Sequence, residues 1–164
     1  MTELRGVDNT SGRHLFSLHV SHLAEYPEHL ELASPRFVLF LCADGRVLDD
    51  TPVLRFGLRA LTQGAAYFCV WGPDCERIHH LLDTACMDAV PNESDDTVIM
   101  TTAHKGESLP EALWFAINLA WPASAYEDAC RTVLALTVES SEWDREIVGW
   151  LTDLPALNEE WERD

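Results

Sequence analysis

Four short runs of apolar residues alternate along the chain with four segments in which apolar residues recur at helical spacing. The runs cover residues 36–43, 65–71, 97–102 and 131–138, and they are rich in β-branched and aromatic side chains. The first is apolar throughout rather than at every second position, which is typical of a strand covered on both faces of a parallel sheet. The alternation of strands and helices therefore predicts an α/β protein.

Residues that start and stop helices stand at the ends of the helical segments. The expected N-terminal caps are Thr51, Asp74, Ser108, and Ser140 or Ser141. Ser108 is followed by Glu111, which predicts a capping box. Gly64 and Pro122 predict the ends of the first and third helices. The last helix is expected to run to Leu154 with one apolar face.

Right-handed crossovers between parallel strands place helices on both faces of the sheet. We therefore expect one domain over residues 1–164, with a three-layer α/β/α fold of Rossmann-like or flavodoxin-like type and a mainly parallel sheet of four or five strands. Residues 1–35 form an N-terminal extension or edge element. Within them, residues 15–20 alternate apolar and polar side chains, which predicts either an edge strand, with an antiparallel one as an option, or the start of a short helix. Residues 158–164 are expected to form a frayed acidic tail.

The charge balance is the most unusual feature of the composition. The 164 residues are 47% hydrophobic, as in ordinary globular proteins, but 28 acidic residues against 11 Lys and Arg give a net charge of −17. Such a field repels the phosphates of nucleic acids and anionic membrane surfaces, so we expect neither as a partner. A basic protein is the partner that the charge favours.

The chain also lacks the apolar segments that direct proteins to or across membranes. Its first thirty residues carry charged side chains and four histidines, and its longest apolar runs are far shorter than the about 20 residues that span a bilayer. Its five cysteines are odd in number and irregularly spaced. These features favour free thiols in a reducing cytoplasm.

In a parallel sheet, ligands bind outside the carboxyl ends of the strands. This rule selects the loops at residues 44–50, 71–75, 103–108 and 139–142. Neither GxGxxG nor GxxxxGK[ST] occurs in the chain, so nucleotide binding through a glycine-rich loop is not expected.

Three residues in these loops are candidates for catalysis. Asp44 and Asp74 follow the first two predicted strands, where two carboxylates can hold Mg²⁺ for hydrolysis or phosphoryl transfer. The simpler interpretation is a turn residue and a helix cap. His104 is a candidate base for Cys75, whose place in the first turn of a helix favours the thiolate, although the adjacent Asp74 opposes it.

Cys75 and His79 are also candidate metal ligands, because residues four apart share one face of a helix. Zinc needs at least one further ligand, and no nearby residue completes a known spacing. We interpret them as a first-turn cysteine and a surface histidine beside His80, and expect no metal and no cofactor.

The last quarter of the chain combines acidic residues with tryptophans. Residues 123–164 hold 11 acidic residues and three arginines, a net charge of −8. Interfaces are enriched in tryptophan. The expected binding residues are Trp71, Glu142, Glu146, Glu159 and Trp161.

Two segments, Tyr67–His79 and Ser108–Phe115, resemble a small family of uncharacterised bacterial α/β proteins. The resemblance covers about the middle half of the chain. It implies an α/β domain and a bacterial or phage source, and it carries no activity and no catalytic residue.

Two functions remain open from the sequence. The first is a non-enzymatic, cytoplasmic interaction module of the immunity, antitoxin or inhibitor type that binds a basic partner. The alternative is a small Mg²⁺-dependent hydrolase or phosphoryl-transfer enzyme with its site at the strand ends. Enzymes need their carboxylates together in a pocket, whereas a binding protein can distribute them over an open face. Solubility alone also explains an acidic surface.

Overall fold

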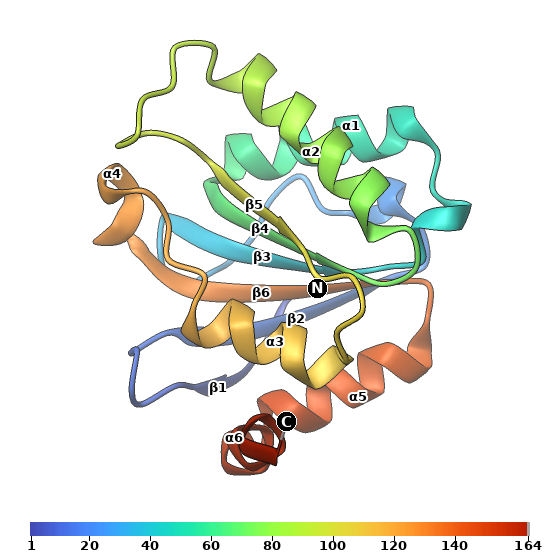
Figure 1. The fold of residues 1–164 in the computed structure, drawn as a ribbon, viewed down its shortest axis with the longest axis vertical. Helices are drawn as coiled ribbons and strands as arrows, with labels where there is room; N and C mark the ends of the chain where they lie inside the picture. Colours follow the sequence, from blue (N-terminus) through green and yellow to red (C-terminus); the bar gives the residue numbers. More distant parts are fainter. Residues whose placement is uncertain (164) are drawn as a thin grey trace.

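Six strands form one sheet in the order β1-β2-β6-β3-β4-β5 in the computed structural model, which describes residues 1–163 (Figure 1). The strands are β1 (Glu3–Val7), β2 (His14–Val20), β3 (Arg36–Cys42), β4 (Ala65–Trp71), β5 (Met100–Ala103) and β6 (Cys130–Val138). All neighbouring pairs are parallel except β1 and β2, which are antiparallel. The predicted α/β protein with a mainly parallel sheet is confirmed.

Helices cover both faces of this sheet, as predicted (Figure 1). On one side lie α1 (Asp50–Gln63) and α2 (Cys75–Ala89), and on the other α3 (Leu109–Asn118), α5 (Ser141–Leu151) and α6 (Leu154–Arg163). Short turns of helix, η1 (Leu23–Glu25), η2 (Gly45–Val47) and α4 (Ser124–Glu127), lie in the connections. The apolar side chains on the two faces of the strands form two separate cores.

The prediction of four or five strands was wrong, because the N-terminal segment supplies two. β2 is not an edge strand: it lies between β1 and β6 and runs parallel to β6. Its Leu15, Phe16 and Leu18 are all buried, so both of its faces pack against the cores. β1 was not predicted, since Glu3 and Arg5 make this outer strand polar.

Local capping signals located some helix ends and missed others. Thr51 is not the cap of α1, which begins at Asp50 after Asp49, and α3 ends at Asn118, before Pro122. Ser108 and Glu111 form the predicted capping box, Ser140 caps α5, and Gly64 ends α1 with a φ of 112°. Asp74 was wrongly predicted as a side-chain cap: its backbone is left-handed, with φ 58°, and its carboxylate makes no capping hydrogen bond.

The chain end is helical rather than frayed. The predicted last helix stops at Leu151, and a second helix, α6, follows after a turn in which Asp153 accepts a hydrogen bond from the Ala156 amide at 3.2 Å. Trp161 stacks on Trp114 of α3, with ring centroids 4.0 Å apart and planes 4° from parallel. This packing holds α6 against the domain. The final residue of the expected tail, Asp164, lies outside the described residues.

One buried charge connects the N-terminal hairpin to α3. Arg13, whose exposed fraction is 0%, donates hydrogen bonds to the carbonyl oxygens of Ala116, Ile117 and Ala120 at 2.8–3.2 Å. Its guanidinium also lies 4.2 Å from the ring centroid of Trp121. A cation is favourable here because the carbonyls at a helix C-terminus carry partial negative charge.

All five cysteines are free and buried. Burial raises the pKa of each thiol, to about 12 for Cys69 and Cys86. Among the described residues, no helix is both long and apolar enough to cross a membrane.

Candidate functional site

A pocket lies where sheet topology predicts a ligand site. The chain runs outward from β3 through β4 to β5 and then returns to the other side of β3 as β6, so the strand order reverses between β3 and β6. Ligands of parallel sheets bind beside such a reversal, at the carboxyl ends of the strands. A pocket of about 690 Å³ opens at this edge, formed mainly by the loops after β4 and β5.

Aromatic side chains form one wall of this pocket. Trp71, at the end of β4, packs edge-on against Trp143 of α5, with ring centroids 5.2 Å apart. The Trp71 indole donates a hydrogen bond to the Glu107 carbonyl oxygen at 2.9 Å. Trp71 therefore joins the loop after β5 to the end of β4.

His104 is a buried residue of the pocket lining, and both its ring nitrogens already have partners. Nδ1 lies 2.8 Å from a Glu107 carboxylate oxygen, and Nε2 lies 2.9 Å from the Thr102 hydroxyl. Cys75 is also buried, and burial raises the pKa of its thiol. The expected Cys75–His104 pair is therefore not formed: no imidazole nitrogen is directed to the sulfur, and the site disfavours the thiolate.

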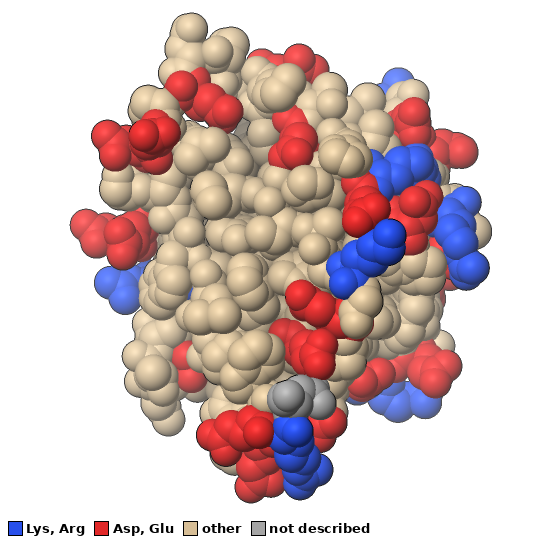
Figure 2. Space-filling model, in the orientation of Figure 1, with Lys and Arg blue, Asp and Glu red and all other residues tan. Residues whose placement is uncertain are grey.

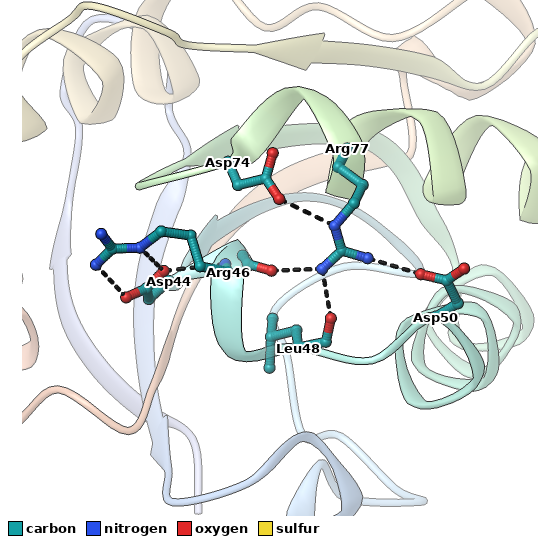
Figure 3. Close-up of polar contacts among 7 residues, drawn as sticks. Asp44, Arg46, Leu48, Asp50, Asp74 and Arg77 are labelled. Atoms are coloured by element: carbon teal, nitrogen blue, oxygen red, sulfur yellow. Dashed lines mark hydrogen bonds and ion pairs between the residues drawn. The ribbon is translucent and has the colours of Figure 1, made fainter.

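The two candidate catalytic aspartates are held by different arginines (Figure 3). Asp44 accepts hydrogen bonds from Nε and Nη2 of Arg46 at 2.9 and 2.8 Å, and these bonds hold the pKa of its carboxyl below the usual value. Asp74 accepts a hydrogen bond from Nε of Arg77 at 3.0 Å.

Arg77 has a structural role beyond this ion pair. It also pairs with Asp50 and donates to the carbonyl oxygens of Gly45 and Leu48 (Figure 3). One guanidinium thus binds α2 to the connection between β3 and α1. Asp44 and Asp74 take part in this loop structure and do not converge on a shared cation position.

Within residues 1–163, one group of three ligand side chains lies close enough to hold a metal ion, and it contains His79, His80 and Asp83 of α2. Cys75, the expected partner of His79, is not in this group. Instead, His79 Nε2 lies 3.7 Å from Asp83 Oδ2. The Thr101 hydroxyl of β5 lies 2.9 Å from the same nitrogen.

Exposed carboxylates gather on α5, α6 and the turn between them. This acidic surface, as we call it, consists of Glu142, Glu146, Asp153, Glu159 and Glu162, all exposed. None of the five forms an ion pair among the described residues, whereas the neighbouring Glu160 pairs with Arg163 at 3.6 Å. Figure 2 shows acidic side chains clustered at the α6 end of the molecule, below a broad uncharged region.

A shallow groove of about 220 Å³ lies within the acidic surface, between α5 and α6. It is lined by Glu146, Gly149, Trp150, Asp153 and Ala156. The Trp150 indole donates to Glu146 Oε1 at 3.4 Å. Trp161, by contrast, has one ring face covered by Trp114, so much of its contact surface is used within the chain.

Three side chains that shape these sites were not identified from the sequence. Glu107 follows His104 by three positions in a loop. Asp83 follows His79 by four positions, and this spacing places His79 and Asp83 on one face of α2. Arg77 follows Asp74 by three. Each spacing is common in an acidic chain, so it becomes informative only when the structure shows the contact.

Comparison with known proteins gives one family match. The model described as Domain of unknown function (DUF7684) matches residues 15–153, from β2 to the turn after α5. This confirms the resemblance to an uncharacterised family. No curated protein and no solved structure matches the chain.

Proposed function

We propose that the chain, which belongs to this family of unknown function, is a non-enzymatic interaction module whose acidic surface binds a basic protein. The observation that carries the proposal is the set of five exposed carboxylates without an ion pair among residues 1–163. Uncompensated charge of one sign attracts a partner of the opposite sign and accelerates association.

The groove between α5 and α6 suits a cationic side chain. It combines the carboxylates of Glu146 and Asp153 with the indole of Trp150. Arginine binds carboxylates through paired hydrogen bonds and also packs well on aromatic rings. We therefore place an arginine of the partner in this groove.

The metal-dependent hydrolase is the weaker alternative. Its two carboxylates, Asp44 and Asp74, are occupied by Arg46 and Arg77. Cation binding there would first have to break both ion pairs. In the pocket itself, the Lys105 ammonium lies 3.6 Å from a Glu76 carboxylate oxygen, so the charge of Lys105 is also compensated within the chain.

Small acidic modules of this kind act as immunity proteins, antitoxins or inhibitors when a basic partner must be neutralised, and we propose such a role. We place the protein in the cytoplasm, where its five free, buried thiols stay reduced. We also classify the fold as Rossmann-like: counted from β3, the strands β5, β4, β3 and β6 lie in the order 3-2-1-4, as do the first four strands of that fold.

The proposal predicts that charge reversal on the acidic surface abolishes binding without unfolding the protein. The triple variant E142K/E146K/E159K replaces exposed helix carboxylates, whose contribution to stability is small. The wild type and the variant are each immobilised and exposed to lysate of the native host at about 50 and 500 mM NaCl. The electrostatic screening length is severalfold shorter at the higher salt concentration. The retained protein is identified by mass spectrometry, and its affinity is then measured by calorimetry.

We expect a basic protein to bind the wild type at low salt, and to bind the variant at least tenfold more weakly. A partner that binds both forms equally, or that is insensitive to salt, contradicts the proposal. Retention of an acidic or neutral protein also contradicts it.

The groove is tested separately through Gly149. The space beside its Cα is open, with no atom within 4 Å of where a Cβ would lie. G149A therefore adds one methyl group without a clash, and G149L extends a side chain into the groove. Since alanine favours a helix over glycine by about 1 kcal/mol, G149A should be at least as stable as the wild type. We expect G149L to weaken the partner at least tenfold and G149A to have little effect. If G149L binds the partner as the wild type does while the triple variant loses binding, the partner contacts another part of the acidic surface.

A further inference from the structure

We propose that His79, His80 and Asp83 form a binding site for a divalent transition-metal ion, with zinc as the best match. One ligand atom from each residue lies within 4.8 Å of the other two. All three belong to α2: His80 is next to His79 in the sequence, and Asp83 follows His79 by four positions. Two imidazoles and one carboxylate, with a fourth position open, form the ligand set of a zinc site that keeps water or an external donor.

The distance between two of the donor atoms is already close to that of a chelate. His79 Nε2 and Asp83 Oδ2 are 3.7 Å apart. Two donors on a tetrahedral zinc ion, each bonded at about 2.0–2.1 Å, lie about 3.4 Å from one another. A side-chain shift of a few tenths of an ångström therefore brings this pair to bonding geometry.

Thr101 of β5 orients this pair as an outer hydrogen-bonding partner. Its hydroxyl donates to Asp83 Oδ1, which leaves Oδ2 directed to His79. His79 Nε2 also lies 3.2 Å from the Thr101 carbonyl oxygen, to which only a protonated ring nitrogen can donate. A metal ion would replace that proton. Hydrogen bonds of this kind hold metal ligands in orientation and increase affinity.

The third ligand and the surroundings also favour a cation. His80 is exposed, and its ring centroid lies 5.5 Å from that of His79, so it can turn to the ion without repacking the core. The thiols, which are stronger zinc ligands, are all buried and do not compete in the folded protein. The net charge of −17 raises the local concentration of cations.

The test is a titration of the chelator-treated, full-length protein with ZnCl₂ by calorimetry, and with CoCl₂ by visible absorption. We expect one ion per chain and the cobalt absorption bands of nitrogen and oxygen ligands, without the thiolate charge-transfer band. H80A and D83N should each weaken zinc binding at least tenfold. H22A, which removes an exposed histidine outside this group, is the matched control and should bind as the wild type does.

Both test variants alter surface side chains, and circular dichroism melting curves confirm that they remain folded. T101V provides a second, indirect test: it removes the hydroxyl that orients Asp83 and should weaken binding while leaving the ligands in place. The proposal is overturned if the wild type binds no zinc at one ion per chain. It is equally overturned if H80A and D83N bind zinc as tightly as H22A, since the ion then lies elsewhere.

Discussion

At the scale of single residues, the most consequential side chain is the buried Arg13. Its guanidinium binds three carbonyl oxygens at the end of α3 and is covered by Trp121. Burial lowers its pKa from the usual value, because the surrounding protein solvates the charge less well than water does. The carbonyl partners and the aromatic ring offset part of that cost. Without the guanidinium, these carbonyls lose their donors.

We predict that R13M lowers the free energy of unfolding by about 3 kcal/mol, since it keeps the apolar stem but leaves buried acceptors without partners. Urea unfolding at neutral pH, followed by circular dichroism, measures this change. The control is R131M at an exposed arginine, for which we expect a change within about 0.5 kcal/mol. Equal losses in the two variants would mean that the contacts of Arg13 contribute nothing beyond surface charge.

Residue roles were predictable where the partner is near in sequence. The caps at Ser108 and Ser140 bond to amides three positions away, so the local sequence contains the whole interaction. Arg13 bonds to residues more than a hundred positions away, and Arg77 bonds to Asp50, 27 positions away. Such roles depend on the packing of the complete fold.

At the scale of elements, α6 shows how a charged segment becomes ordered. Most of its last residues are acidic, and residues 158–164 were expected to fray. Leu157 is buried in the core on the α3 side of the sheet, however, and Trp161 stacks on Trp114. The Trp114 indole also donates to Asn158 at 3.0 Å. Three contacts on one face are thus enough to dock the helix.

We predict that W161A lowers the free energy of unfolding by at least about 1 kcal/mol, because an aromatic pair contributes about that much beyond its buried area. Amide hydrogen exchange should accelerate most in α6, which can open separately, and less in β3, which exchanges through global unfolding. The neighbouring exposed residue supplies the control variant, E162A, for which neither quantity should change. If exchange in α6 stays slow in W161A, the ring stack does not hold the helix.

Elements with a strong periodic signal were predicted well, and those that depend on their surroundings were not. β3, β4 and β6 appear within a residue of the expected ends, because buried parallel strands are continuous apolar runs. β5 is shorter than expected and starts at Met100. β1 contains no apolar run: at the sheet edge its Glu3 is exposed and its Arg5 is half-buried.

At the scale of the whole molecule, the buried thiols make the folded state less stable as the pH rises into the alkaline range. Burial raises the pKa of Cys86 to about 12, whereas an unfolded cysteine titrates near 8.5. The folded state therefore retains a proton that the unfolded state loses. Stability from this group is complete below about pH 8.5 and declines as the pH rises toward 12, by about 1.4 kcal/mol per pH unit.

We predict that C86A reduces the slope of unfolding free energy against pH by about 1.4 kcal/mol per unit between about pH 9 and 10.5. Urea unfolding in the presence of a phosphine reductant measures the slope for wild type and variant. The comparison uses slopes because the substitution also changes packing at every pH. An unaltered slope would show that this thiol ionises equally in both states.

The candidate sites also depend on how the whole chain packs, which explains why they were predicted only in part. The sequence located the carboxyl-edge loops and the acidic charge of α5 and α6. It did not reveal that Arg46 and Arg77 occupy the two aspartates. Nor did it reveal the groove, which exists because the chain turns at Asp153 and brings Ala156 beside Gly149.

The central place of β6 sets the order in which the protein can be completed during synthesis. β6 is the last strand to be made, yet it separates β2 from β3 and pairs with both. His14 pairs with Thr132, and synthesis from one to the other, a separation of 118 residues, takes about 6–24 s at 5–20 residues per second. Until then, the emerging chain has two unpaired strand edges. A chain that terminates before residue 130 keeps them permanently, and such edges promote aggregation. Premature truncation should therefore yield insoluble fragments rather than partly active ones.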